Sequence, residues 1–143
     1  MISSRTVLLD SLARTQAEAQ ALARTIRGGE CIAFSGALGA GKTTFIRFLC
    51  AALGAKVEAS SPTYVLQHEY PTKGDLRIEH WDLYRIPTLP IELEERIPGN
   101  CVRLIEWAER FPELMREVTM LIELRLESET ERSMSISSGM AKR

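Results

Sequence analysis

The stretch FSGALGAGKTTFIRFL, residues 34–49, places small residues and one lysine between two apolar segments. Residues 31–35 form a short apolar run, which is typical of a buried strand. Residues 42–53 repeat apolar side chains at helical spacing, and Gly54 follows as a C-terminal cap. The small residues therefore connect a strand to the start of a helix, where free N–H groups and the helix dipole favour an anion.

The loop has the spacing Gly36, four residues, then Gly41, Lys42 and Thr43. This is the spacing of the P-loop, in which backbone N–H groups surround the α- and β-phosphates of a nucleotide. Lys42 then reaches the β- and γ-phosphates, and Thr43 offers its hydroxyl to Mg²⁺. The alternative is a plain glycine-rich turn, which the flanking strand and helix disfavour. The predicted nucleotide contacts in the loop are Gly36, Ala37, Leu38, Gly39, Ala40, Gly41, Lys42, Thr43 and Thr44.

Length and composition limit the organisation of the chain. Its 143 residues suffice for one core, so we expect a single nucleotide-binding domain over 1–143, with a frayed tail from about 138. Apolar and charged contents of 45% and 26% are those of an ordinary globular protein. No stretch approaches the roughly 20 apolar residues of a membrane span, and the N-terminus lacks a signal-peptide core. We therefore expect a cytoplasmic location.

The net charge argues against a protein that binds nucleic acid by itself, and the cysteine content argues against a disulfide or a cysteine metal site. A net charge of −1 lacks the basic excess of a self-sufficient nucleic-acid binder, so any contact with RNA is expected through a partner. The three cysteines are odd in number and have no CxxC spacing. Cys31 and Cys50 fall on apolar faces of predicted elements, so we expect buried free thiols rather than a disulfide or a metal site.

Strands and a few helices alternate along the rest of the chain. Residues 10–26 predict a helix that is capped by Asp10 or Ser11, carries an apolar stripe from Leu12, and ends at Gly28 or Gly29. The other predicted elements are a strand at 5–9, a hairpin of 64–70 with 76–84, a short helix at 91–95, a strand at 102–107, a helix or turn at 108–115, and a closing hairpin of 118–127 with 132–137. We predict a three-layer, P-loop NTPase-like α/β domain whose mixed sheet is parallel around the P-loop strand and antiparallel in the hairpins.

Two acidic residues stand at predicted strand ends, where a phosphate-bound Mg²⁺ often takes a carboxylate ligand. Asp82 ends the strand in IEHWDLYR, and Glu106 ends the strand in RLIEW. Asp82 has a second interpretation as a turn or capping residue, and an isolated strand-end Glu is usually only solvated. The loop SSPTY adds Thr63, whose hydroxyl can reach the γ-phosphate or Mg²⁺. We interpret His68 and His80 as packed or surface side chains, because no ligand cluster accompanies them.

Taken in order, GALGAGKTTF, SSPTYVL, HWDLYR and LIEW resemble the TsaE family, small bacterial P-loop ATPases of the tRNA threonylcarbamoyladenosine pathway. The resemblance covers most of the chain. It implies that ATP and Mg²⁺ are bound and that ATP is hydrolysed in support of two partner proteins, TsaD and TsaB. TsaD transfers the threonylcarbamoyl group to an adenosine beside the tRNA anticodon, so tRNA is contacted only through the complex.

The resemblance also implies roles for residues at matching positions. Glu106, Asp82 and Lys42 would be the catalytic residues, with Glu106 orienting water or acting as base. Thr43, Asp82 and Glu106 would stand beside the metal. Trp107 would lie near the nucleotide, and Thr63 would sit in a switch-like loop.

Two features depart from the family pattern. The family loop commonly reads Gly-Asp-Leu-Gly, whereas Ala37 stands here in place of the Asp and removes a carboxylate beside the phosphates. The segment 86–101 is shorter than the helical stretch usual in the family, and it holds Pro87, Pro90 and Pro98. If this segment forms part of the partner surface, the docking geometry differs.

Two other functions stay open. A small-molecule or nucleoside kinase uses the same loop but needs an acceptor pocket and a lid with arginines, for which 143 residues leave little room. A nucleotide-gated binding module with little hydrolysis also fits the loop. A GTPase is disfavoured, because the chain has no Asn-Lys-x-Asp stretch.

Overall fold

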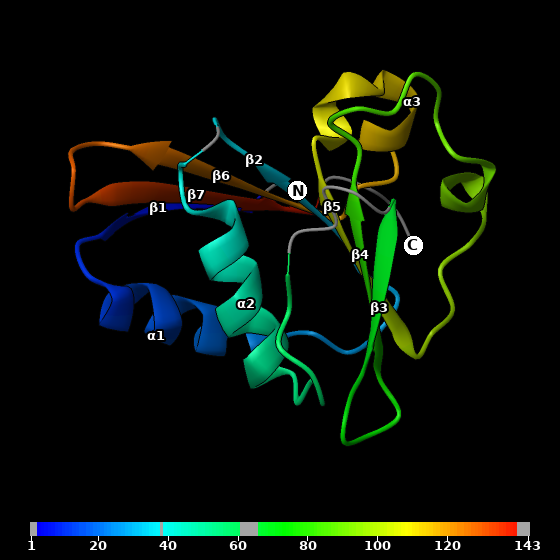
Figure 1. The fold of residues 1–143 in the computed structure, drawn as a ribbon, viewed down its shortest axis with the longest axis horizontal. Helices are drawn as coiled ribbons and strands as arrows, with labels where there is room; N and C mark the ends of the chain where they lie inside the picture. Colours follow the sequence, from blue (N-terminus) through cyan, green and yellow to red (C-terminus); the bar gives the residue numbers. More distant parts are fainter. Residues whose placement is uncertain (1–2, 38, 61–65, 140–143) are drawn as a thin grey trace.

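The computed structural model describes residues 3–37, 39–60 and 66–139, which build one seven-stranded sheet of order β1-β7-β6-β2-β5-β4-β3 (Figure 1). Its strands are β1 Ser3–Leu9, β2 Cys31–Ser35, β3 Gln67–Pro71, β4 Arg77–Asp82, β5 Cys101–Glu106, β6 Met120–Leu126 and β7 Arg132–Ser138. Its helices are α1 Leu12–Ala23, α2 Lys42–Ala52 and α3 Pro112–Met115, with two 3₁₀ helices, η1 Ile91–Glu94 and η2 Ala108–Arg110. None of the helices in these ranges is long and apolar enough to cross a membrane.

The direction of the strands agrees with the predicted mixed sheet. The four strands β6, β2, β5 and β4 run parallel, with β2 between β5 and β6. The pairs β3/β4, β6/β7 and β1/β7 are antiparallel. Both predicted hairpins are therefore confirmed, and the parallel part surrounds the strand that precedes the glycine-rich loop.

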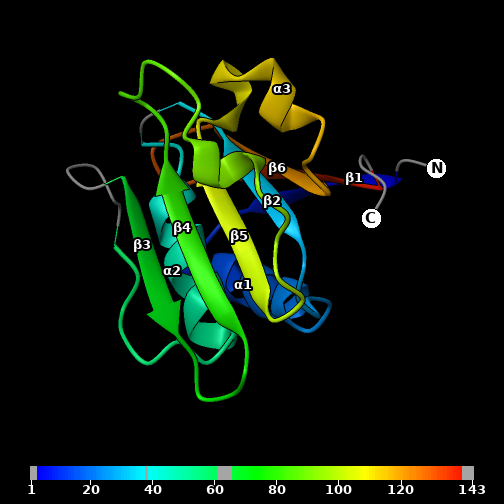
Figure 2. The same cartoon turned by 90° about the vertical axis from the view of Figure 1, so that its right-hand side faces the viewer.

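Both faces of the sheet are covered, which gives the three predicted layers. Helices α1 and α2 lie on one face, whereas η1 and α3 lie on the other (Figures 1 and 2). A sheet that is covered on both faces needs buried side chains on both, and successive side chains of strand β2 point alternately into the two cores. Ile32 and Phe34 belong to the core under α1 and α2, while Cys31 and Ala33 belong to the core on the opposite face.

Helix α1 begins as predicted and ends earlier than predicted. Ser11 is the N-cap, and its hydroxyl accepts from the backbone N–H of Arg14. The helix ends at Ala23, because the Thr25 backbone N–H and hydroxyl both bond to the Leu22 carbonyl and close a tighter turn. Leu12 was predicted to begin the apolar stripe, but it is 69% exposed, and the buried residues of the helix begin at Thr15.

The C-terminal strand reaches the position where the predicted frayed tail begins. Ser138 pairs with Ser3 of β1 and with Met120 of β6, so strand β7 extends to the position where fraying was expected to begin. The remainder of that prediction, at 140–143, lies outside the described residues.

An ion pair is buried on the η1 and α3 face of the sheet. Arg103 Nε donates to Glu79 Oε1 over 2.8 Å, and Trp81 Nε1 donates to the same oxygen over 3.0 Å. Burial alone would raise the pKa of Glu79. The hydrogen bonds from Arg103 and Trp81 and the Arg103 charge outweigh burial and hold the pKa of Glu79 below its ordinary value of 4.5.

Glu79→Gln is expected to lower the free energy of unfolding by about 1–3 kcal/mol at pH 7, since it leaves a buried guanidinium without its counter-charge. The folded-state pKa is depressed, so the stabilisation is present above the unfolded-state pKa and is lost as pH falls through the folded-state value. Urea titrations at pH 7 and at about pH 3 should show the difference from wild type shrinking in acid. Glu69→Gln is the control, because the Glu69–Arg77 pair is exposed and should contribute little. Equal losses in the two variants would contradict this account.

The three cysteines are free and buried, as predicted. Burial raises the pKa of each of the Cys31, Cys50 and Cys101 thiols to about 12. At pH 8 the folded protein should therefore react slowly with a chromogenic disulfide reagent, and all three thiols should react at once in concentrated urea. Rapid labelling of any thiol in the folded protein would contradict the buried assignment.

Candidate functional site

A pocket of about 540 Å³ lies at the carboxyl ends of the parallel strands. This edge is where ligands bind in open α/β sheets. The predicted residues that line it are Gly39, Ala40, Gly41, Lys42, Thr43, Thr44, Asp82, Glu106 and Trp107. Gly36 and Ala37 lie in the same loop but do not line the pocket, while Leu38 and Thr63 lie outside the described residues.

The loop between β2 and α2 needs its glycines for two reasons. Gly39 and Gly41 have φ angles of 84° and 102°, a left-handed conformation that other residues rarely adopt. At Gly36 a Cβ atom would lie 2.5 Å from the Leu124 carbonyl oxygen, so only glycine allows the loop to pass this close to β6. Gly41 is also the N-cap of α2, and it offers no side chain to the first N–H groups of the helix. These groups stay available to an anion.

Lys42 begins helix α2 inside the pocket. Lys42 is only 5% exposed, and its Nζ atom has no hydrogen-bond partner among the described residues. Burial lowers the pKa of Lys42, against the opposing charges of Glu106, Glu109 and Asp82. A buried ammonium without partners is unfavourable, so the site fits an anionic ligand that supplies them.

Trp107 covers this ammonium. The Nζ atom of Lys42 lies 3.9 Å from the centre of the Trp107 ring, which is a cation–π contact. Trp107 has a φ of 67°, the one positive value outside glycine among the described residues. The centre of its ring lies 4.8 Å from the centre of the Tyr84 ring. The predicted strand 102–107 therefore ends one residue early, because Trp107 turns out of it and over the loop. A bulky residue in this conformation is strained, which is common at functional sites.

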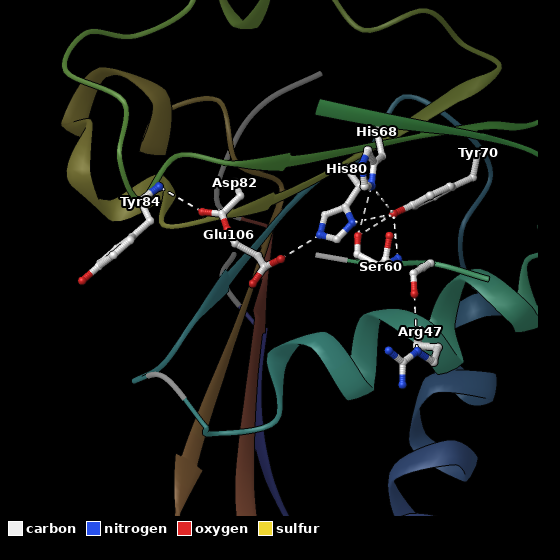
Figure 3. Close-up of polar contacts among 9 residues, drawn as sticks. Arg47, Ser60, His68, Tyr70, His80, Asp82, Tyr84 and Glu106 are labelled. Carbon is white, nitrogen blue, oxygen red and sulfur yellow. Dashed lines mark hydrogen bonds and ion pairs between the residues drawn. The ribbon is translucent and has the colours of Figure 1, made fainter. Parts of the chain in front are cut away.

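Asp82 and Glu106 lie side by side at the tips of β4 and β5, where they are paired in register. Asp82 Oδ1 accepts from the Tyr84 backbone N–H over 2.9 Å, so the predicted turn role of Asp82 is real. Burial, which outweighs the other influences, raises the pKa of Asp82 above its ordinary value. Glu106 is 3% exposed, and its Oε2 atom lies 2.7 Å from His80 Nε2 (Figure 3).

The contact between His80 and Glu106 was not predicted from the sequence. His80 is fully buried, which agrees with the packed alternative of the prediction, and it joins Glu106 to Tyr70, whose hydroxyl lies 3.0 Å from His80 Nδ1. The signal was present, because His80 stands two residues before Asp82 on one strand and therefore faces the same side of the sheet. The partner of His80 is 26 positions away in sequence, so no local cluster indicated it.

The pocket also receives residues from elements distant in sequence. Ser11, Leu12 and Thr15 line it from α1, and Thr130 and Arg132 from the β6–β7 hairpin. No local pattern singles these residues out, because only the order of the strands brings β1 and β7 beside the loop. Tyr84 and Arg85 follow Asp82 directly and line the pocket as well.

The donor groups suit magnesium better than a softer metal. Among the described residues, no group of three or more His, Cys, Asp or Glu side chains is arranged to hold a metal ion. The oxygens of Thr43, Asp82 and Glu106 line one pocket, and Mg²⁺ is typically held by one or two such groups together with phosphates and water. These residues therefore fit a metal that arrives with a nucleotide.

Comparisons with known proteins agree with this geometry. Residues 9–134 match the family model "TsaE: Threonylcarbamoyl adenosine biosynthesis protein TsaE". The TsaE protein of Treponema pallidum is 35% identical over 118 residues, which are 80% of this chain and 86% of that protein. The TsaE protein of Aquifex aeolicus is 41% identical over 107 residues, which are 73% of this chain and 77% of that protein.

A solved structure supports the fold. The crystal structure of YdiB from Bacillus subtilis superposes with a TM-score of 0.75 at 26% sequence identity, over 96% of this chain and 87% of YdiB. The family match and the identities both extend over most of the chain. The chain therefore belongs to the TsaE family of tRNA threonylcarbamoyladenosine biosynthesis proteins.

Proposed function

We propose that this protein binds and hydrolyses Mg·ATP in the pocket at the carboxyl ends of β2, β4 and β5. The single observation that carries the proposal is the buried Lys42 ammonium. It has no hydrogen-bond partner among the described residues, and it stands at the start of α2 in a pocket that also holds two strand-end carboxylates. A polyphosphate supplies the oxygens that this ammonium lacks, and the N–H groups at the start of α2 add to its binding.

Each residue of the pocket has a separate role in this proposal. Lys42 binds the β- and γ-phosphates, and Thr43 and Asp82 hold the metal side of the nucleotide. Glu106 orients the attacking water and accepts its proton. Bound Mg²⁺ supplies neutralisation of the phosphate charge. Trp107 and the loop residues, including Ala37 and Leu38, lie beside the nucleotide, and we assign Thr63 to the γ-phosphate side on the resemblance alone.

We further propose that turnover is slow in the isolated chain. The Trp107 ring lies against Lys42 Nζ, so phosphate must compete with this contact. One carboxylate oxygen of Glu106 is already in contact with His80, so only the other is free to orient water. The partners in this proposal are TsaD and TsaB, and the location is the cytoplasm. The complex modifies the adenosine beside the tRNA anticodon, and this chain does not contact the tRNA directly.

ATP turnover of the purified chain, alone and with TsaB and TsaD added, tests the proposal. We expect release of inorganic phosphate that depends on Mg²⁺ and rises when both partners are present. A screen for phosphorylated small molecules in the same samples distinguishes hydrolysis from a kinase reaction. Absence of phosphate release under all conditions, despite Mg·ATP binding, would favour the nucleotide-gated binding module instead.

A further inference from the structure

A line of polar side chains leads from the pocket through the α1 and α2 side of the sheet to Ser60 (Figure 3). Glu106 Oε2 lies 2.7 Å from His80 Nε2, and His80 Nδ1 lies 3.0 Å from the Tyr70 hydroxyl. Glu106, His80 and Tyr70 are 3%, 0% and 4% exposed. Hydrogen bonds in such a buried position are strong and hold their members in fixed orientations.

The Tyr70 hydroxyl holds the backbone of Ser60 from both sides. It accepts from the Ser60 N–H over 3.1 Å and lies 2.9 Å from the Ser60 carbonyl oxygen. His68 Nδ1 is 3.2 Å from each of these oxygens. One residue earlier, Arg47 of α2 donates to the Ala59 carbonyl over 3.4 Å. Ser60 is the last described residue before the segment 61–65.

The hydrogens of this line cannot be arranged independently. The Tyr70 hydroxyl carries one hydrogen, which goes to one of three neighbours, the Ser60 carbonyl, His80 Nδ1 or His68 Nδ1. If His80 is neutral and Glu106 ionised, only a hydrogen on Nε2 reaches the carboxylate, so Nδ1 must accept from Tyr70. If Tyr70 donates to Ser60 instead, Nδ1 must carry a hydrogen. In a neutral ring Nε2 then faces the carboxylate as a second acceptor, and only an imidazolium donates to both Tyr70 and Glu106. The position of Ser60 and the orientation of Glu106 are therefore linked through one imidazole.

We propose that His80 is a positioning residue for Glu106, and that Tyr70 couples this positioning to the backbone at Ser60. The proposal rests on the proposed ATPase function, which makes Glu106 the group that orients water. His80 fixes Oε2, so that Oε1 is left for the reacting water. Displacement of Ser60 withdraws the Tyr70 hydroxyl from its present position, which changes the hydrogen bonding of His80 and loosens Glu106. Events at Ser60 thereby reach the reacting centre without contact with the nucleotide.

Steady-state kinetics of five variants, one of them a double variant, test the positioning role. His80→Leu is expected to lower kcat roughly 10- to 100-fold with KM for ATP within about twofold, since it disturbs orientation and not binding. His80→Gln should recover part of the loss, because its amide N–H can replace Nε2–H. Tyr70→Phe should lower kcat by a smaller factor and add nothing when combined with His80→Leu. Thr72→Val is the matched control, because it loses the two hydrogen bonds of the Thr72 hydroxyl, to the Leu76 carbonyl and from the Gly74 N–H, in the same β3–β4 hairpin but outside the line.

A second readout does not depend on turnover. The chain has two histidines, so ¹⁵N-histidine labelling gives two rings to assign, and His68→Asn identifies the signals of His80. We expect the ring resonances of His80 to shift in both Glu106→Gln and Tyr70→Phe, because both variants change a group that contacts the ring. An unchanged His80 ring in either variant would overturn the coupling. Wild-type kcat in His80→Leu would overturn the positioning role alone, whereas a wild type without turnover, with and without partners, would overturn it together with the proposed function.

Discussion

Replacement of Glu106 by Gln is expected to lower the rate of ATP hydrolysis by ~10²–10⁴-fold, the usual effect of removing a general base. Glutamine keeps the shape of the side chain and an oxygen that can accept from His80, so the buried contact at 2.7 Å has a substitute. What the variant loses is the ability to take a proton from water. The affinity for Mg·ATP should stay within a few-fold of wild type, because the proposed phosphate contacts come from Lys42 and the loop N–H groups.

The control for this variant is Glu113→Gln, which makes the same chemical change on the exposed surface of α3. Single-turnover measurements at saturating ATP separate the chemical step from product release. If Glu106→Gln hydrolyses ATP at the wild-type rate, Glu106 is not the base, and Asp82 becomes the remaining strand-end candidate.

The second large effect is expected in Lys42→Met, which should weaken Mg·ATP binding by on the order of 10- to 100-fold and remove turnover. A hydrogen bond to a charged group contributes about 1.5–3 kcal/mol, which corresponds to this loss of affinity. Methionine retains most of the apolar stem of lysine. Without nucleotide the variant should unfold at the same temperature as wild type or higher, because it no longer buries an ammonium that has no partner among the described residues.

This pairing of weaker binding with undiminished stability distinguishes a ligand-binding lysine from a structural one. Lys56→Met is the control, because Lys56 is exposed beyond the end of α2 and should change neither property. A Lys42→Met protein that binds Mg·ATP as tightly as wild type would remove the main support for the nucleotide site. One that binds weakly and also unfolds at a much lower temperature would show that Lys42 holds the fold.

The glycine-rich loop and the two strand-end acids could be predicted because their signals are local. A P-loop is defined by spacing along the chain, and an acid at the end of an apolar run lies at the sheet edge in any parallel arrangement. Asp82 and Glu106 are therefore found beside the loop, although β4 and β5 are separate in sequence.

The parts that could not be predicted depend on contacts between distant segments. His80 contacts a carboxylate on another strand, and Arg132 lines the pocket because β7 is placed between β1 and β6. Trp107 was expected near the nucleotide on the family resemblance. Its left-handed backbone conformation, with the ring over Lys42 and against Tyr84, could not be predicted from strand propensity.

The segment 86–101 is built around a single turn of 3₁₀ helix. Element η1 begins directly after Pro90, and its Leu93 is buried in the core on the η1 and α3 face. Arg110 donates to the Leu83 and Ile86 carbonyls and so fixes the start of the segment. The prolines therefore accompany an ordered connection, anchored at both Leu83 and Leu93.

Calorimetric titration of the purified protein with Mg·ATP is the most direct measurement of the central claim, which is that a triphosphate occupies the loop that begins α2. We expect a saturable heat of association with one nucleotide per chain, reduced in Lys42→Met and retained in Lys56→Met. The absence of any heat of association, alone and in the presence of TsaB and TsaD, would contradict the account.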